Sequence, residues 1–347
     1  MEPLPDLLDP PVPEDELGRV RRVGVEIELT HLDVEAIAAT VANLFGGAVT
    51  RETDYLSRVV TDLGTFRVEA DLALLQRIGR AREQQGGEQG ALAAARDALA
   101  SLAELVAPFE VVTPPVPYPS LPMLDDLVAA LRARGGQGTR EGFLQALALQ
   151  LNPQVPSEEP GSIHAHLRAY AALEPWLRMR REVDVTRRIL PFVDAYPVAY
   201  AERLLERGSP PDLPELVDEY LRYNATRNRS LDMLPLFSLL APRRVAAAVV
   251  DDRINPRPTF HYRLPDSRVG DARWRVTDEW HHWLVVERVA ATPRLLDELA
   301  RGYLDTLSGR SGSTMHAMWP PRCEQILQRW RYGLAGAATG DEPRPAA

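Results

Sequence analysis

The chain has 347 residues, of which 45% are hydrophobic and 26% are charged, and its formal net charge is −9. This composition is typical of a soluble globular protein, and the negative charge argues against nonspecific nucleic-acid binding as its main task. All 40 basic residues are arginine, which excludes both a P-loop, because it needs a lysine, and a Schiff-base lysine.

The two ends of the chain differ from its middle. Residues 1–19 are acidic and proline-rich, which predicts a disordered lead-in and is unlike a secretory signal. Residues 333–347 predict a flexible tail. There is no run of about 18 apolar residues, so we expect no membrane span and a cytoplasmic protein.

The first readable element is RRVGVEIELT, residues 21–30. On a strand its apolar residues share one face: Val23, Val25, Ile27 and Leu29. Glu26 and Glu28 then lie on the other face, about 6.6 Å apart at Cα. Either this is the solvated face of a half-buried strand, or the two carboxylates converge on divalent cations.

The rest of the first half alternates between predicted helices and short strands. Asp33 is a plausible N-cap for a helix that stops at Gly46 and Gly47. Further strands are predicted at 48–53, 57–62, 64–71, 109–119 and 141–153, and further helices at 88–107 and 121–136.

The second half is mostly helical. Apolar residues recur at helical spacing in 163–181, 196–208, 212–228 and 293–307, and one strand-like segment, 256–267, interrupts them. Because strands and helices do not alternate regularly, we expect an α+β fold with an antiparallel sheet. We expect a single domain over 20–332, strand-rich in 20–160 and helix-rich in 161–332.

Two further strands carry acids beside apolar residues. In TDLGTFRVEAD, Glu69 and Asp71 repeat the spacing of the first pair, and Asp62 stands just before the turn at Gly64. Glu110 enters the apolar strand FEVV. Three such strands predict a site for a polyvalent cation, and oxygen ligands favour magnesium or manganese over zinc.

The ordered series of motifs resembles a known family. GVEIE, a glycine turn leading into VEAD, then EVVTPP and QLNP are similar to the amidoligase branch of the glutamate–cysteine ligase and glutamine synthetase superfamily. TRRILPFVDAYP, YNATRNRSLDMLPLF and RPTFHYRLPDS resemble further segments of amidoligases. The likeness covers roughly residues 21–330.

The resemblance implies a fold and a reaction. It implies a funnel-like antiparallel sheet of the glutamine synthetase type that holds ATP and Mg²⁺. A carboxylate is phosphorylated to an acyl phosphate, and an amine displaces the phosphate to form an amide or peptide bond. The partners would be small-molecule or peptide carboxylates and amines.

The resemblance also implies site residues. The metal ligands would be Glu26, Glu28, Asp62, Glu69 and Glu110. Arg263 would bind phosphate and act in catalysis together with Glu69, and Gln150 would contact the nucleotide. Arg188, Arg227 and Asn224 would bind substrate, although a salt-bridged helix surface is the alternative for any single arginine.

Two positions depart from the family pattern. Gln150 stands where histidine is common, and His261 where glutamate is common. As a metal ligand, His261 would favour Mn²⁺ over Mg²⁺; alternatively it hydrogen-bonds a neighbour or the nucleotide. These departures leave two rival functions open, a non-catalytic binding protein that kept the fold and a metal-dependent hydrolase.

Overall fold

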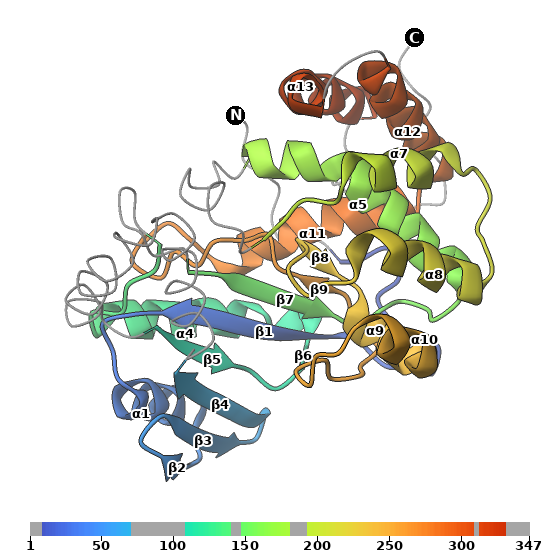
Figure 1. Ribbon diagram of the computed structural model, residues 1–347. Coiled ribbons are helices and arrows are strands. Elements are labelled where there is room, and N and C mark those ends of the chain that lie inside the picture. Colours follow the sequence, from blue (N-terminus) through green and yellow to red (C-terminus); the bar gives the residue numbers. More distant parts are fainter. Residues whose placement is uncertain (1–8, 71–107, 140–146, 181–192, 309–311, 331–347) are drawn as a thin grey trace, which may run out of the picture.

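The computed structural model describes residues 9–70, 108–139, 147–180, 193–308 and 312–330. In this part of the chain, nine strands form one open antiparallel sheet with the main order β2-β3-β4-β5-β1-β7-β9-β8, and β6 pairs with β1 (Figure 1). The strands are β1 (Arg22–Leu29), β2 (Ala48–Thr53), β3 (Leu56–Thr61), β4 (Gly64–Ala70), β5 (Phe109–Val112), β6 (Val116–Pro117), β7 (Leu149–Pro153), β8 (Leu231–Asp232) and β9 (His261–Tyr262). The predicted α+β class with an antiparallel sheet is therefore confirmed, whereas the glutamine synthetase type of funnel stays a prediction.

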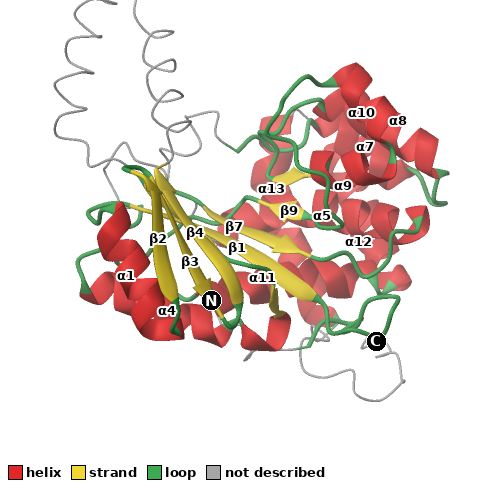
Figure 2. Ribbon diagram, turned by 90° about the horizontal axis from the view of Figure 1, so that it is seen from below, coloured by secondary structure: helices red, strands yellow, loops and turns green. Residues whose placement is uncertain are grey.

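The helices pack against one face of the sheet and against one another. They are α1 (Val34–Phe45), α4 (Pro122–Ala133), α5 (Pro160–Arg180), α7 (Val198–Glu206), α8 (Leu213–Asn224), α9 (Leu234–Leu240), α10 (Pro242–Ala248), α11 (Val276–Ala290), α12 (Pro293–Leu307) and α13 (Gly312–Arg329). Helices α1 and α4 lie along the sheet, and α11 continues this layer toward the helical half (Figure 2). None of the described helices is long and apolar enough to cross a membrane.

The first strand and helix form as the sequence predicts. Along β1 the four alternate apolar residues are at most 1% exposed, while Glu26 and Glu28 are half-buried. The side chain of Asp33 accepts a hydrogen bond from the Ala36 amide and caps α1. The helix ends at Gly46, whose φ of 72° lies in the left-handed region that glycine tolerates best.

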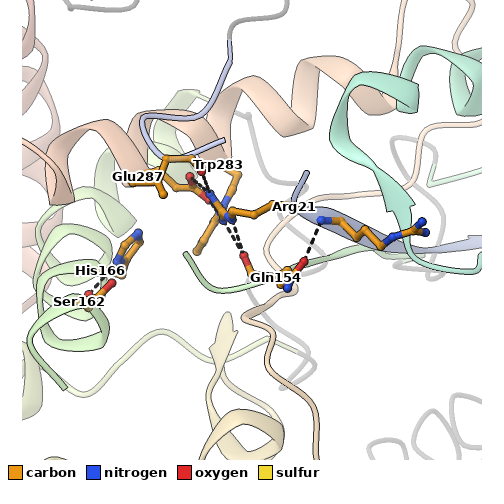
Figure 3. A network of polar contacts seen from close by, with 8 residues as sticks. Arg21, Gln154, Ser162, His166, Trp283 and Glu287 are labelled. Carbon is orange, nitrogen blue, oxygen red and sulfur yellow. Dashed lines mark hydrogen bonds and ion pairs between the residues drawn. The ribbon is translucent and has the colours of Figure 1, made fainter. Parts of the chain in front are cut away.

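A buried ion pair sets β1 beside β7. The guanidinium of Arg21 donates to both carboxylate oxygens of Glu287 on α11, at 2.8 and 2.7 Å, and its Nε donates to the Gln154 carbonyl at 2.9 Å (Figure 3). Burial, the largest single cause, raises the pKa of Glu287, but the charge and hydrogen bonds of Arg21, together with His166 and Trp283, outweigh it and lower that pKa. The contact ties the start of β1 to the end of β7, and this register pairs Glu26 with Gln150.

The described part of the lead-in is ordered, contrary to the prediction for residues 1–19. Asp15 caps a turn by accepting from the Leu17 and Arg19 amides. Arg21 donates to the Val12 carbonyl at 2.8 Å, so the segment from residue 9 onward packs against the folded chain. Amino-acid composition predicted disorder because it contains no information about contacts with distant parts of the chain. Residues 1–8 and the predicted tail lie outside the described residues.

Other predictions are confirmed in part. The predicted strand over 109–119 is divided into β5 and β6 around Pro114 and Pro115, which lack the amide donor that a strand ladder needs. In the segment 256–267 only His261 and Tyr262 form a strand, and its partner β8 was not predicted. The predicted helix over 88–107 lies outside the described residues.

Candidate active site

One face of the sheet carries the polar side chains that the sequence singled out. In register, Glu69 of β4 is opposite Glu110 of β5, and Glu110 is opposite Glu28 of β1. We call these three residues the carboxylate row. Directly opposite residues in a sheet point to the same face with Cβ atoms about 5 Å apart. Three carboxylates from distant parts of the sequence are therefore neighbours.

The carboxylate row is electrostatically unfavourable unless something compensates it. Like charges directly opposite each other destabilise a sheet, and Glu110 has one on each side. All three residues are half-buried rather than fully solvated. Hard carboxylate oxygens in such a row fit a divalent cation such as Mg²⁺.

The side chains of the row turn toward protein donors. Glu28 Oε2 accepts from the Ala148 amide at 2.8 Å, and Glu69 Oε1 accepts from Arg67 Nη2 at 2.6 Å. Across the described ranges, no three acidic, histidine or cysteine side chains are grouped as a metal site. The backbone thus brings the predicted ligands together, and cation binding would require Glu28 and Glu69 to exchange these partners.

Asp62 lies apart from the row. It is exposed in the turn between β3 and β4, next to the Thr61–Gly64 pair, whereas Glu69 stands at the other end of β4. Five residues of strand separate Gly64 from Glu69, or about 17 Å. The expectation that Asp62 joins Glu69 is therefore wrong, because a hairpin sends residues on either side of its turn away from the tip. The neighbouring Asp71 lies outside the described residues.

Beside the row, the buried side chain of Gln150 is the centre of a partly buried hydrogen-bond network. Its Oε1 accepts from Arg263 Nε at 2.7 Å. Its Nε2 lies 3.1 Å from Glu26 Oε1, 2.8 Å from Asn152 Oδ1 and 3.1 Å from His261 Nδ1. Because an arginine can only donate, the amide oxygen must face Arg263 and the amide nitrogen must face the three acceptors. We call these five residues the amide network.

The amide network gives Gln150 a structural role. Both of its polar atoms bond protein groups, so in this arrangement it holds Arg263 and Glu26 in place, and its contact with a nucleotide stays a prediction. Asn152 Nδ2 also donates to Glu26 Oε1, at 2.8 Å. Arg263 Nη1 donates to the Arg227 carbonyl at 2.6 Å, which fixes the guanidinium at a second point.

His261 forms a hydrogen bond with a neighbour, as one of its two predicted alternatives states. It is 3% exposed, and burial followed by the charges of Arg257, Arg263 and Arg227 lowers its pKa well below the usual value. The ring is therefore neutral. Gln150 Nε2 can only donate, so Nδ1 is the acceptor in this contact and is engaged with protein in this arrangement.

Asp232 is the cross-strand partner of His261 and is fully buried. Burial raises its pKa to about 6, although the charges of Arg263 and Arg227 oppose the shift. Its Oδ1 accepts from the Leu234 amide at 2.9 Å, and its Oδ2 has no partner in the described part of the chain. This carboxyl group was not predicted from the sequence.

The predicted substrate residues have different outcomes. Arg227 is half-buried, and within the described part of the chain its Nε has no hydrogen-bond partner and no acidic side chain forms an ion pair with it. Burial and the adjacent Arg263 charge lower its pKa. Asn224, at the end of α8, is fully buried, and neither polar atom of its side chain has a partner among the described residues. Arg188 lies outside the described residues.

Asn152 was also missed, although a signal for it existed. It stands two residues after Gln150 on β7, the same spacing as Glu26 and Glu28 on β1. Alternation along QLNP would have placed both amides on one face. Asp232 had a weaker signal, a lone acid within the apolar segment SLDMLPLF.

This geometry and the comparison with known proteins agree on a class of protein. A sheet face that combines a carboxylate row with a partly buried arginine–amide network is suited to anionic substrates and divalent cations. A family model described as "putative amidoligase enzyme" matches residues 19–285, and the chain belongs to this amidoligase family. Family membership indicates an enzyme of the ligase class. No curated protein matches the chain.

Proposed function

We propose that the protein is an ATP-dependent ligase that joins a carboxylate to an amine through an acyl phosphate. ATP would transfer its γ-phosphoryl group to the carboxylate and leave as ADP. The amine nitrogen would then attack the acyl carbon, with release of inorganic phosphate and a proton. Membership of the amidoligase family supports the ligase class, and the polar face of the sheet supports the use of ATP.

The observation that carries the proposal is that the acidic carboxylate row and the amide network with its arginine lie on one face of the sheet. Glu26 and Glu28 alternate on the central strand β1, so each faces the same side as the carboxylate row. Glu26 is also a member of the amide network, where it accepts from Gln150, the residue that bonds Arg263. An acidic half would hold cations, and a cationic half would bind the oxyanions that those cations accompany.

Magnesium is the cation that fits the donors best. Glu28, Glu69 and Glu110 would hold it, with Glu26 beside them, and when bound it would offset the negative charge of the phosphates. The expected preference for manganese over magnesium depended on an imidazole ligand, and His261 is engaged with Gln150. The proposed set of ligands therefore omits both His261 and Asp62.

The arginines would act on the anionic groups. Arg263 is fixed at Nε and at Nη1, so its fork is oriented before a ligand arrives. A preorganised arginine stabilises charge that develops on a transferred phosphoryl group without reorganising during the reaction. Arg227, which no described acid pairs, would bind the substrate carboxylate.

The test is release of ADP as a function of added carboxylates and amines. A ligase releases ADP at a rate that depends on both compounds and consumes the amine in equal amount. ADP release without any amine would favour a hydrolase, and nucleotide binding without turnover would favour a binding protein. Either of these results would overturn the proposal.

A further inference from the structure

The polar face carries an arginine pair toward the opposite end of the strand order from Arg263. Arg58 of β3 and Arg67 of β4 are direct cross-strand partners, so both point to the same face. Their side chains are 50% and 47% exposed, and are therefore open to a ligand. Neither residue is part of the amide network.

The register places the arginine pair on the same face as the proposed active site. From Arg67 the pairing runs to Val112, then to Glu26 and to Gln150, and Gln150 bonds Arg263. Four strand spacings separate β4 from β9, which is about 19 Å. The carboxylate row runs parallel to this line, two residues further along β4, β5 and β1, so the two cationic ends and the row share one polar surface.

Each of these two arginines is held only weakly by its acidic partner. Two like charges directly opposite each other destabilise a sheet, and each arginine has one acid, Glu52 for Arg58 at 2.7 Å and Glu69 for Arg67 at 2.6 Å. Partly exposed ion pairs contribute only about 0–1 kcal/mol. An anionic ligand can therefore replace the acids beside the arginines at low cost in free energy. A cation can likewise draw Glu69 away from Arg67.

Glu69 links the arginine pair to the carboxylate row. The same carboxylate that bonds Arg67 is the cross-strand neighbour of Glu110. A cation that draws Glu69 toward Glu110 and Glu28 removes the acid that neutralises Arg67. Cation binding in the row and anion binding at the arginine pair should therefore reinforce each other.

We propose that Arg58 and Arg67 form an oxyanion subsite that takes a carboxylate or phosphate group of a ligand bound along the polar face, opposite to Arg263. This proposal rests on the proposed function for the role of Glu69 as a cation ligand. It adds a second anionic end to the ligands that the face binds. Phosphate and carboxylate share the chemistry, and the probes below separate them.

The chain offers a matched control in Arg51. This residue lies on β2, and its side chain is 51% exposed and ion-paired with Glu35 and Asp54. Its cross-strand partner is Ser57, which is buried on the opposite face of the sheet. Arg51 thus matches the pair in exposure and ion pairing but not in the face that it occupies.

The experiment is isothermal titration of inorganic triphosphate and of glutarate, each with and without Mg²⁺. The proteins are wild type, Arg58→Gln, Arg67→Gln and Arg51→Gln, and thermal melts confirm that each is folded. With Mg²⁺ we expect Arg67→Gln and Arg58→Gln to weaken the binding of one probe by about tenfold, the scale of one charge-assisted hydrogen bond. The probe that loses affinity identifies the subsite as one for phosphate or for carboxylate. Equal affinities in all four proteins would overturn the proposal.

A second variant tests the link through Glu69. Glu69→Gln removes the charge that neutralises Arg67, so in Mg²⁺-free buffer it should bind the same probe several-fold more tightly than wild type. Weaker or unchanged binding would show that Glu69 does not compete with the anion for Arg67. If these binding results hold while no amine-dependent ADP release is found, the ligase proposal fails and the oxyanion subsite stands.

Discussion

The two halves of the polar face are built in opposite ways. In the amide network, Gln150, Asn152 and His261 are at most 6% exposed and bond one another. In the carboxylate row, half-buried residues of the same charge face each other, and Glu28 and Glu69 turn to protein donors. The network is therefore set before a ligand arrives, whereas under the proposed function the row would change its partners when a cation binds.

This difference corresponds to what each half would do. Orientation of an arginine requires rigid donors and acceptors around it, and burial supplies that rigidity. Cation binding requires carboxylates that can move together, and partial exposure allows the movement. The same sheet supplies both because β1 lies between β5 and β7 and contributes an acid to each half.

The largest expected effect concerns Asp232 at the buried end of the network. Its pKa is raised from 3.8 to about 6, so its contribution to stability is fully present below about pH 4 and is lost as the pH rises through about 6. Asp232→Asn keeps an acceptor for the Leu234 amide and removes the buried charge. Relative to wild type, the variant should gain about 3 kcal/mol of unfolding free energy between pH 4 and pH 7.

Urea unfolding of both proteins across this pH range measures the effect. The exposed residue Asp252, changed to Asn, is the matched control. A difference between Asp232→Asn and wild type that does not change with pH would show that the carboxyl group is not held neutral by burial.

The next effect concerns the row. Glu28→Gln keeps an oxygen that can accept from the Ala148 amide but removes one charged ligand. Binding of magnesium-ATP should weaken by about 2 kcal/mol, within the range for a lost charge-assisted contact. Isothermal titration measures it, with Glu35→Gln on the other face of the sheet as the control. Unchanged affinity would remove Glu28 from the cation site.

A smaller effect is expected from Arg263→Lys. Lysine keeps the charge but cannot bond Gln150 and the Arg227 carbonyl with the geometry of a planar fork. We expect kcat for ADP release to decrease by about tenfold, or roughly 1.4 kcal/mol of barrier, with nucleotide affinity little altered. Arg273→Lys, at a 91% exposed position, is the control. Wild-type turnover would assign the role to another residue.

The smallest effect tests whether a cation compensates the row. If Mg²⁺ offsets the repulsion around Glu110, it should raise the unfolding free energy of wild type. Glu110→Gln should gain less from Mg²⁺, by about 0.5 kcal/mol, the scale of a cross-strand charge pair. Urea unfolding with and without Mg²⁺ measures this gain. An equal gain in both proteins would mean that the cation binds elsewhere.

The sequence alone determined the local features of this site. Alternation with a period of two assigned Glu26, Glu28 and Glu69 to polar faces, and all three lie there. The cap at Asp33 and the stop at Gly46 were likewise read from neighbouring residues. These features were predictable because the hydrogen bonds and side-chain directions that produce them span only a few positions.

Only the tertiary structure decided which strands are neighbours, and therefore which polar side chains lie side by side. Strand order brings Glu69, Glu110 and Glu28 into one row, and the turn before Gly64 removes Asp62 from it. Gln150 contacts Arg263 across 113 positions of the sequence, a contact that no local pattern indicates. Long-range burial selects strand neighbours, and a pattern with a period of two carries no information about which strand will lie beside which.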